Sequence, residues 1–223
     1  MSQSAVETTY YGLNQLDRKL ERYVDFDGGF YVELGANNGV DQSNTYYFEK
    51  QRNWRGVLVE PTPHNYLYCR ANRSPANRIF CAACVSFDYR EKFVPIAYSN
   101  LMSTPIGLQS DIAEPLAHAQ VGRQFLHSYE DVFVFGALAT PLNVLLLQAE
   151  APSRIDLLSL DVEGAELEVL KGIDHDAFRF RYLCIECRDV ERLKAYLFPR
   201  NYRLVDQLSQ HDYLFACNIT LPR

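Results

Sequence analysis

The 223-residue sequence lacks several features that mark whole classes of protein. No apolar run reaches the roughly 20 residues that a helix needs to cross a bilayer. The first residues, MSQSAVETTYYG, also lack the charged-then-apolar order of a signal peptide. The net charge of −6 argues against nucleic acid as a partner, because phosphates must be met by cations. We therefore expect a cytoplasmic globular protein without a membrane span.

Metal-binding cysteine clusters are also missing, although the chain has six cysteines. Cys81 and Cys84 form one CxxC pair and Cys184 and Cys187 another, but the pairs are too far apart for a ribbon-type zinc site. Both pairs lie in strand-like runs, where residues three apart point to opposite faces and cannot converge on one metal. We interpret the cysteines as buried apolar side chains rather than zinc ligands, redox groups or disulfides.

Strand-like and helix-like segments alternate along most of the chain. Leucines at 13, 16 and 20 have helical spacing and predict an N-terminal helix at about residues 10–25. Short apolar runs then alternate with helical patterns, which is typical of a parallel sheet covered by helices on both faces; these runs are GFYVELG, RGVLVE, RIFCAACVS, RIDLLSLDV and RYLCIEC. The connection DQLSQHD is too short for a crossover helix, so the last two strands should pair antiparallel.

The pattern loosens between residues 91 and 151, where KFVPIAY predicts an edge strand. We expect one domain over residues 1–223, with an insertion at about 99–130. Loops over a rigid site often carry specificity, so we place acceptor recognition in this insertion. Its candidate contacts are Asn100, Ser103, His118 and His127.

The first strand runs into a turn that looks built for a nucleotide but is short of glycine. Residues 30–40 are FYVELGANNGV, with glycine only at 35 and 39. A dinucleotide turn is expected to show G-x-G-x-x-G, because glycines let the backbone approach the phosphates. Ligands of open α/β sheets bind at the carboxyl ends of the strands. Acidic residues end several predicted strands and would repel a dinucleotide there; they are Glu33, Glu60, Asp161, Glu163 and Glu186.

S-adenosylmethionine (SAM) suits this acidic rim, because it carries a sulfonium and an ammonium but no phosphate. Glu60 stands about twenty residues beyond the turn, where an acid that accepts from ribose hydroxyls is expected. Gly35 would let the backbone pass close under the ligand. Asn37 can replace a glycine, since asparagine tolerates a left-handed conformation. Glu33 would accept from the ammonium, directly or through water, or brace the loop.

Three segments resemble the FkbM-type SAM-dependent methyltransferases over about residues 28–218. They are ELGANNG, VLVEP and IDLLSLDVEGAELEVLKG, and SNT after the turn resembles one branch of that family. Glu33 stands where Asp is usual, and Ser159 where Lys is common. The resemblance implies a class I fold of the α/β type: a Rossmann-like, mostly parallel sheet of seven strands, with helices on both faces and the last strand antiparallel.

The resemblance also implies an O-methyltransferase that acts on a hydroxyl, commonly of a sugar in a glycan, a nucleotide sugar or a glycosylated natural product. The cofactor would be SAM and its product S-adenosylhomocysteine (SAH). The residues expected to bind the cofactor are Glu33, Gly35, Ala36, Asn37, Gly39, Ser43, Asn44, Thr45, Glu60, Pro61 and Asp161.

Asp161, Glu163 and Glu186 follow neighbouring predicted strands and form the expected catalytic cluster. Their oxygens would either hold Mg²⁺ against the acceptor or supply a carboxylate base. Two other classes of function stay open: a nucleotide-dependent oxidoreductase, disfavoured by the missing glycine and the acidic rim, and a non-catalytic binding module with the same fold. The sequence sets no expectation for the oligomeric state.

Overall fold

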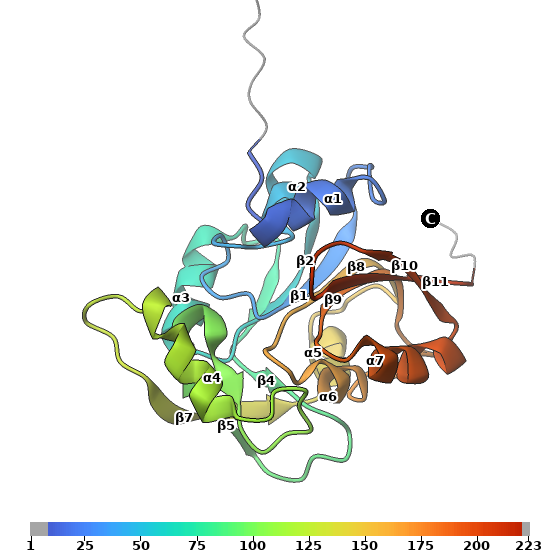
Figure 1. Cartoon of the computed structure of the whole chain (residues 1–223). Coiled ribbons are helices and arrows are strands. Elements are labelled where there is room, and N and C mark those ends of the chain that lie inside the picture. The colour runs from blue at the N-terminus through green and yellow to red at the C-terminus, as the bar shows by residue number, and fades with distance from the viewer. Residues whose placement is uncertain (1–8, 220–223) are drawn as a thin grey trace, which may run out of the picture.

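A seven-stranded sheet forms the centre of the molecule (Figure 1). The structure is a computed structural model that describes residues 9–219. In space the strands run in the order β3-β2-β1-β8-β9-β11-β10. Their bounds are β1 Phe30–Leu34, β2 Arg55–Val59, β3 Arg78–Phe80, β8 Arg154–Leu160, β9 Arg179–Glu186, β10 Tyr202–Gln207 and β11 Asp212–Cys217. Strand β11 lies antiparallel to both β9 and β10, which confirms the predicted ending.

Helices cover both faces of this sheet. Side chains alternate along a strand, so Val32 and Leu34 of β1 pack in one cluster and Tyr31 in the other. The first cluster includes leucines of α5 (Leu142–Gln148), α6 (Glu166–Leu170) and α7 (Val190–Leu197). The second includes residues of α1 (Leu16–Glu21), α2 (Tyr46–Arg52) and α3 (Pro63–Asn72).

Short 3-10 turns supplement these helices: η1 Leu13–Gln15, η2 Asn100–Met102, η3 Gly122–Phe125 and η4 Phe198–Arg200. The segment expected to be a helix at about 10–25 consists of η1 followed by α1. Asn14 and Gln15 have positive φ angles of 54° and 57°, which separate the two. Within residues 9–219 we find no helix with the length and apolarity needed to cross a membrane.

A second, four-stranded sheet has the order β4-β7-β5-β6 and lies near α4 (Pro115–Val121) in Figure 1. Its strands are β4 Ala83–Cys84, β5 Phe93–Tyr98, β6 Thr104–Pro105 and β7 Phe133–Thr140. Val85, Val94, Ile96 and Ala137 are among the residues of its small core. This sheet was not predicted. Strand β5 pairs with both β7 and β6, so the expectation that KFVPIAY forms an edge strand is wrong.

The run RIFCAACVS, expected to be a single third strand, divides between the two sheets. Its first part, β3, pairs parallel with β2, and its second part, β4, pairs parallel with β7. Only Cys81 and Ala82 separate the two strands. The small sheet is therefore tied closely to the carboxyl edge of the large one.

Candidate functional site

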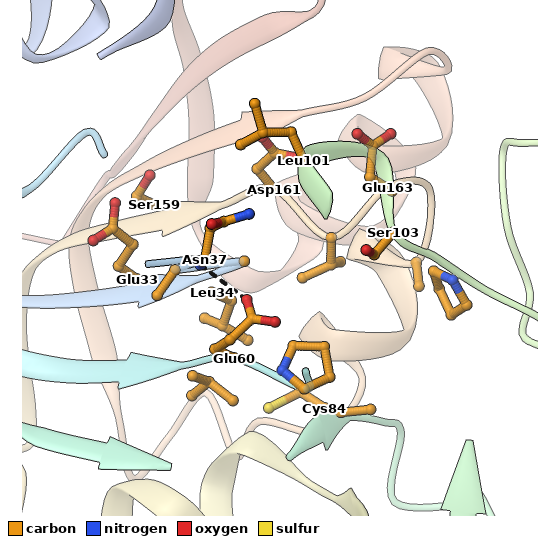
Figure 2. A pocket seen from close by; sticks show the side chains of 18 of the residues that line it. Glu33, Leu34, Asn37, Glu60, Cys84, Leu101, Ser103, Ser159, Asp161 and Glu163 are labelled. Atoms are coloured by element: carbon orange, nitrogen blue, oxygen red, sulfur yellow. Dashed lines mark hydrogen bonds between the residues drawn. The ribbon is translucent and has the colours of Figure 1, made fainter. Parts of the chain in front are cut away.

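A pocket of about 980 Å³ lies at the carboxyl ends of β1, β2 and β8, with part of its wall from the small sheet. Figure 2 shows Glu33 and Ser159 at one end and Glu163 with Ser103 at the other, with Glu60 and Asp161 between them. We call this space the cofactor pocket.

Most of the residues predicted from sequence line this pocket. Those expected to bind the cofactor and found in the lining are Glu33, Gly35, Ala36, Asn37, Ser43, Asn44, Glu60, Pro61 and Asp161. Glu163, Asn100 and Ser103 line it as well. The predicted residues outside the lining are Gly39, Thr45, Glu186, His118 and His127.

The turn after β1 needs unusual backbone angles at two positions of the pocket floor. Gly35 has a φ of 76°, and a Cβ there would overlap the carbonyl oxygen of Asp161. Asn37 has a φ of 45°, which confirms the left-handed conformation expected from its residue type. The missing middle glycine is therefore replaced by an asparagine that takes the same region of backbone space.

Glu60 joins this turn to the end of β2. One carboxylate oxygen accepts from the backbone N–H of Asn37 at 2.9 Å and the other from the N–H of Thr62 at 2.8 Å. Burial raises the pKa of the Glu60 carboxyl, and the two N–H groups oppose that rise. The two bonds fix the plane of the carboxylate, while each oxygen keeps a further lone pair for a ligand hydroxyl.

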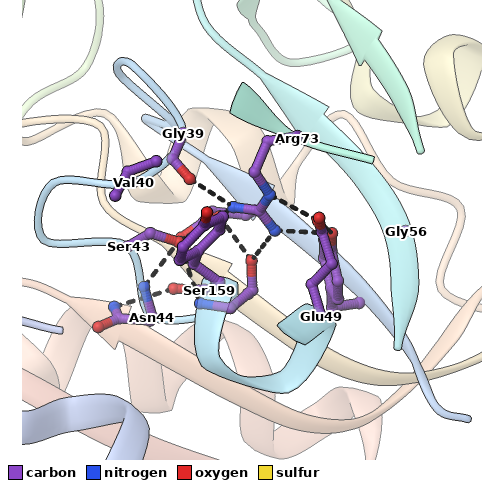
Figure 3. A network of polar contacts seen from close by, with 12 residues as sticks. Gly39, Val40, Ser43, Asn44, Glu49, Gly56, Arg73 and Ser159 are labelled. Carbon is purple, nitrogen blue, oxygen red and sulfur yellow. Dashed lines mark hydrogen bonds and ion pairs between the residues drawn. The ribbon is translucent and has the colours of Figure 1, made fainter. Parts of the chain in front are cut away.

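Glu33 belongs to a buried polar network behind the turn, centred on Arg73 (Figure 3). Its carboxylate accepts from the Ser43 hydroxyl at 2.9 Å, the Thr45 hydroxyl at 2.6 Å and the Asn44 N–H at 3.0 Å. The Arg73 guanidinium lies 3.2 Å from it. Glu33 therefore braces the loop, which is one of the two roles that its sequence position left open.

The Arg73 side chain is fully buried and connects the end of α3 to the turn. It donates to the Gly39 carbonyl at 2.9 Å and pairs with Glu49 at 2.7 Å. Burial opposes the charge of Glu49, but Arg73 outweighs it and lowers the pKa of that carboxyl to about 2. Removing one partner of such a pair typically costs about 3–5 kcal/mol, because the other charge stays buried.

Asn44 contacts Ser159, a position where the family resemblance made a lysine the expected residue. Its amide nitrogen donates to the Ser159 hydroxyl at 3.1 Å. The Asn44 side-chain oxygen is buried near Gly12 and has no hydrogen-bond partner within the described chain. A buried acceptor without a partner costs free energy.

Asp161 and Glu186 form a hydrogen-bonded pair of carboxyl groups. Asp161 is exposed to the pocket that it lines. The protein atoms packed around its carboxyl, and then the neighbouring Glu186 charge, raise the pKa of Asp161 above its ordinary value. Burial, and then the charge of Glu163, raise the pKa of Glu186. Each negative charge disfavours the other, so the two groups titrate as a coupled pair.

Glu163 occupies a strained turn between β8 and α6. Its φ is 53° and that of the following Gly164 is 100°. The Glu163 carboxylate lies 2.8 Å from the imidazole of His118 and 3.5 Å from the guanidinium of Arg188. Strained backbone at a polar pocket is a frequent mark of a functional site. His118, which the sequence places in the insertion, thus contacts Glu163 of the expected catalytic cluster.

The expected Mg²⁺ site does not match the present arrangement of side chains. Among residues 9–219, no group of three or more His, Cys, Asp or Glu side chains is placed to hold a metal ion. Asp161 and Glu186 instead direct their oxygens at each other, and Glu163 directs one at His118. We derive no catalytic step through a metal.

Two residues of the site were not identified from sequence. Arg73 lies 40 positions beyond Glu33, and nothing in the sequence around it signals the contact. Arg188 directly follows Cys187 and approaches Asp111, Glu163 and Glu186 at 3.5–3.7 Å. The one available signal for Arg188 was its place just beyond the end of β9, at the edge where ligands bind.

Comparison with solved structures returns methyltransferases of low sequence identity. A Pyrococcus horikoshii protein proposed to be an RNA methyltransferase is 11% identical, with a TM-score of 0.48 over 98% of this chain and 90% of that one. The precorrin-6y C5,15-methyltransferase of Geobacter metallireducens is 11% identical, with a TM-score of 0.43 over 96% and 92%. A SAM-dependent methyltransferase of Aquifex aeolicus is 11% identical, with a TM-score of 0.42 over 90% and 88%.

Sequence comparison gives the assignment. No curated protein matches the chain, but the model of the methyltransferase FkbM domain matches residues 33–215. The matched range begins at Glu33 and ends in β11, so it contains the turn, Glu60 and the acidic cluster. The chain therefore belongs to the FkbM methyltransferase family, and it is a SAM-dependent methyltransferase with the class I fold.

Proposed function

We propose that the protein transfers the methyl group of SAM to a hydroxyl oxygen of a sugar in a glycan, a nucleotide sugar or a glycosylated natural product. The observation that carries the proposal is the Asp161–Glu186 pair, because Asp161 faces the pocket with a raised pKa. A sugar hydroxyl is weakly acidic and needs a base as it attacks. When bound, SAM supplies an electrophilic methyl group on a sulfonium.

The residues around the turn fit the donor. Glu60 has two free acceptor positions for ribose hydroxyls and is held by Asn37 and Thr62. Asn44 lines the same part of the pocket and is held by its hydrogen bond to Ser159. Gly35 leaves the floor open for a close approach. Pro61 and Ala36 complete the wall on either side of Glu60 and the turn.

The Asp161–Glu186 pair is suited to take the acceptor's proton. It shares one proton and keeps one negative charge, so it has room for a second proton. When Asp161 takes the acceptor's proton, the proton that the pair already shares can stay on Glu186, which lies outside the lining. Alignment of donor and acceptor supplies much of the remaining barrier reduction, on the order of 7–11 kcal/mol in favourable cases.

Mg²⁺ at Asp161, Glu163 and Glu186 is the alternative route. It would need Glu163 to leave His118 and the carboxyl pair to lose its shared proton. Turnover that disappears with EDTA and returns with Mg²⁺ would establish this route. Turnover that is the same in EDTA supports the base.

The insertion at about 99–130 is our proposed region of acceptor contact. Asn100 and Ser103 reach the cofactor pocket from it. Asn100 is also fixed to the turn, since its side-chain oxygen accepts from the Asn37 amide at 3.0 Å. Acceptor and donor would thus meet across a direct contact between insertion and turn.

The test is transfer of an isotope-labelled methyl group from SAM to a panel of methyl glycosides, nucleotide sugars and cell glycans. We expect Asp161→Asn to lose about 10²–10⁴-fold in kcat while still binding SAM. Asp88→Asn, at an exposed site away from the pocket, is the control and should match the wild type. Wild-type turnover by Asp161→Asn would remove it from the mechanism. Label found only on protein or nucleic acid would contradict a sugar acceptor.

A further inference from the structure

A second hollow of about 1,570 Å³ continues from the cofactor pocket. It runs between α3 and the loop before β7, and we call it the aromatic groove. The two spaces share part of their walls: Asn37, Asp41, Asn100 and Leu101 line both. A ligand in the groove therefore extends directly toward the place where the methyl donor binds.

Aromatic rings with large exposed areas line this groove. Tyr129 is 79% exposed, Tyr68 56% and Phe133 48%. Tyr129 comes from the loop before β7 and Tyr68 from α3, so the rings belong to segments distant in sequence. The C–H faces of a pyranose ring pack on aromatic faces of this kind, because the ring carries an apolar body and polar edges, as tyrosine itself does.

Polar groups stand among the rings. The Tyr98 hydroxyl donates to Glu130 and lies 2.9 Å from the imidazole of His64. His64 and Glu130 are themselves 3.5 Å apart, which joins α3 to the loop before β7. Asn65, only 5% exposed, lines the groove with a side-chain nitrogen that has no partner in the described chain. The nitrogen is itself buried, so a ligand oxygen meets it when the Asn65 amide turns toward the groove.

The charge of the groove selects among ligands that stack on aromatic rings. No lysine or arginine is part of its lining, whereas Asp41, Glu130 and Asp131 are. A phosphate-bearing ligand needs cations at its binding site, and a nucleic-acid strand stacks its bases only where the backbone is met by such cations. Neutral hydroxyl groups suit the amide, carboxyl and phenol groups that are present.

We propose that the aromatic groove is a binding site for an uncharged sugar unit of the acceptor. The statement that this sugar is the methyl acceptor rests on the proposed function, whereas binding of a sugar in the groove does not. The site holds the sugar by ring stacking on Tyr129 and Tyr68, by a hydrogen bond from Asn65 and by a hydrogen bond from a sugar hydroxyl to the Glu130 carboxylate. A hydroxyl at its inner end then reaches Asn100 and the cofactor pocket.

Saturation-transfer NMR on the full chain with SAH tests this proposal. The probes are methyl glycosides of glucose, galactose, mannose, rhamnose and fucose, with glucose 6-phosphate as the charged comparison. We expect at least one glycoside to bind, and Tyr129→Ala and Tyr68→Ala each to weaken it about fivefold to tenfold. Phe198→Ala, at a half-exposed ring outside the groove, is the matched control and should bind as the wild type does.

Three results would overturn the groove assignment. They are the absence of glycoside binding, binding by both tyrosine variants that is as tight as that of the wild type, and binding of glucose 6-phosphate that is tighter than that of the glycosides. Labelled-methyl assays on the same glycosides separate the two proposals. Binding that depends on Tyr129 without any methyl transfer supports the groove and contradicts sugar methylation. Methyl transfer that is unchanged in the tyrosine variants supports the reaction and contradicts the groove.

Discussion

Gly35 and Gly28 have nearly the same backbone angle, with φ of 76° and 74°, but different surroundings. A Cβ at Gly35 would overlap the Asp161 carbonyl, whereas a Cβ at Gly28 would meet nothing within 4 Å. We expect Gly28→Ala to cost only the backbone strain of about 1–3 kcal/mol. Gly35→Ala should cost more and also weaken SAM binding. Urea unfolding and calorimetry with SAM measure both effects.

Equal costs for the two alanine variants would contradict the close approach of β1 to Asp161. The pair isolates that contact because the strain from the positive φ is common to both. Loss of SAM affinity in Gly28→Ala as well would show that the effect is not local to the pocket.

Glu186 sets the proton affinity of Asp161, which gives the proposed base a pH signature. The charge of Glu186 raises the pKa at which Asp161 loses the proton that the pair shares. The acidic limb of kcat/KM reports the earlier loss of the pair's second proton, which is easier than for a single acid because the new carboxylate shares the remaining proton. Glu186→Gln removes this sharing, so the acidic limb should move to higher pH in the variant. pH–rate profiles of the two proteins provide the measurement.

An unchanged acidic limb in Glu186→Gln would separate Glu186 from the base. A fall in rate without any shift would indicate a purely structural role. Rescue of the profile by Glu186→Asp would support the carboxyl pair.

For single residues, the sequence predicted the conformation where it depends on the residue type alone. Asn37 was expected to take a left-handed conformation because few residues tolerate it, and the structure confirms this. Arg73 was missed, because its partners Glu33 and Glu49 lie 40 and 24 positions away and meet it only through folding. Contacts of this kind depend on tertiary packing and leave no local pattern.

Among the elements, helix α6 carries a buried acid at its first residue. Glu166 accepts from the backbone N–H groups of Val162 and Gly164, each at 3.1 Å, and so caps the turn before the helix. Burial raises its pKa from 4.5 to about 8. Between these pH values the folded state holds a proton that the unfolded chain releases, so stability falls as pH rises.

We expect Glu166→Gln to remove the fall in stability with rising pH, which amounts to about 1.4 kcal/mol of unfolding free energy per pH unit for one proton. The variant should match the wild type near pH 5 and be more stable at pH 8, because glutamine keeps an acceptor oxygen without a charge. Denaturant unfolding from pH 5 to 9 measures the difference. Glu191→Gln, on an exposed site of α7, is the control. Parallel stability curves for wild type and Glu166→Gln would contradict the raised pKa.

The sequence pattern predicts where most strands lie but not which sheet each strand joins. Four of the five main strand runs each contain one strand of the large sheet, because apolar β-branched runs between helices are distinctive. The fifth, RIFCAACVS, divides between the two sheets. The small sheet was missed, since β4 has only two residues, Ala83–Cys84, and continues an apolar run without a break. Which sheet a strand joins depends on its partner, and β7 lies more than 45 residues further along the chain.

For the whole molecule, a ligand that binds only the folded state raises its stability. SAM or SAH at about 100 times its Kd should add about 2.7 kcal/mol, a rise of roughly 5–10 °C in Tm for a chain of this size. NADH should give no rise, since the turn lacks the phosphate-approaching glycine and the rim is acidic. Thermal unfolding with each ligand is the measurement. Stabilisation by NADH and not by SAH would contradict the assigned cofactor.

The acidic pocket should also interact differently with SAM and with its product SAH. Methyl transfer turns the sulfonium of SAM into the neutral thioether of SAH, so the ligand loses one positive charge while bound beside Asp161 and Glu163. Glu33 takes little part in this change, because Arg73 already balances it. In the proposed arrangement the acidic rim therefore attracts the charged substrate more strongly than the neutral thioether of the product.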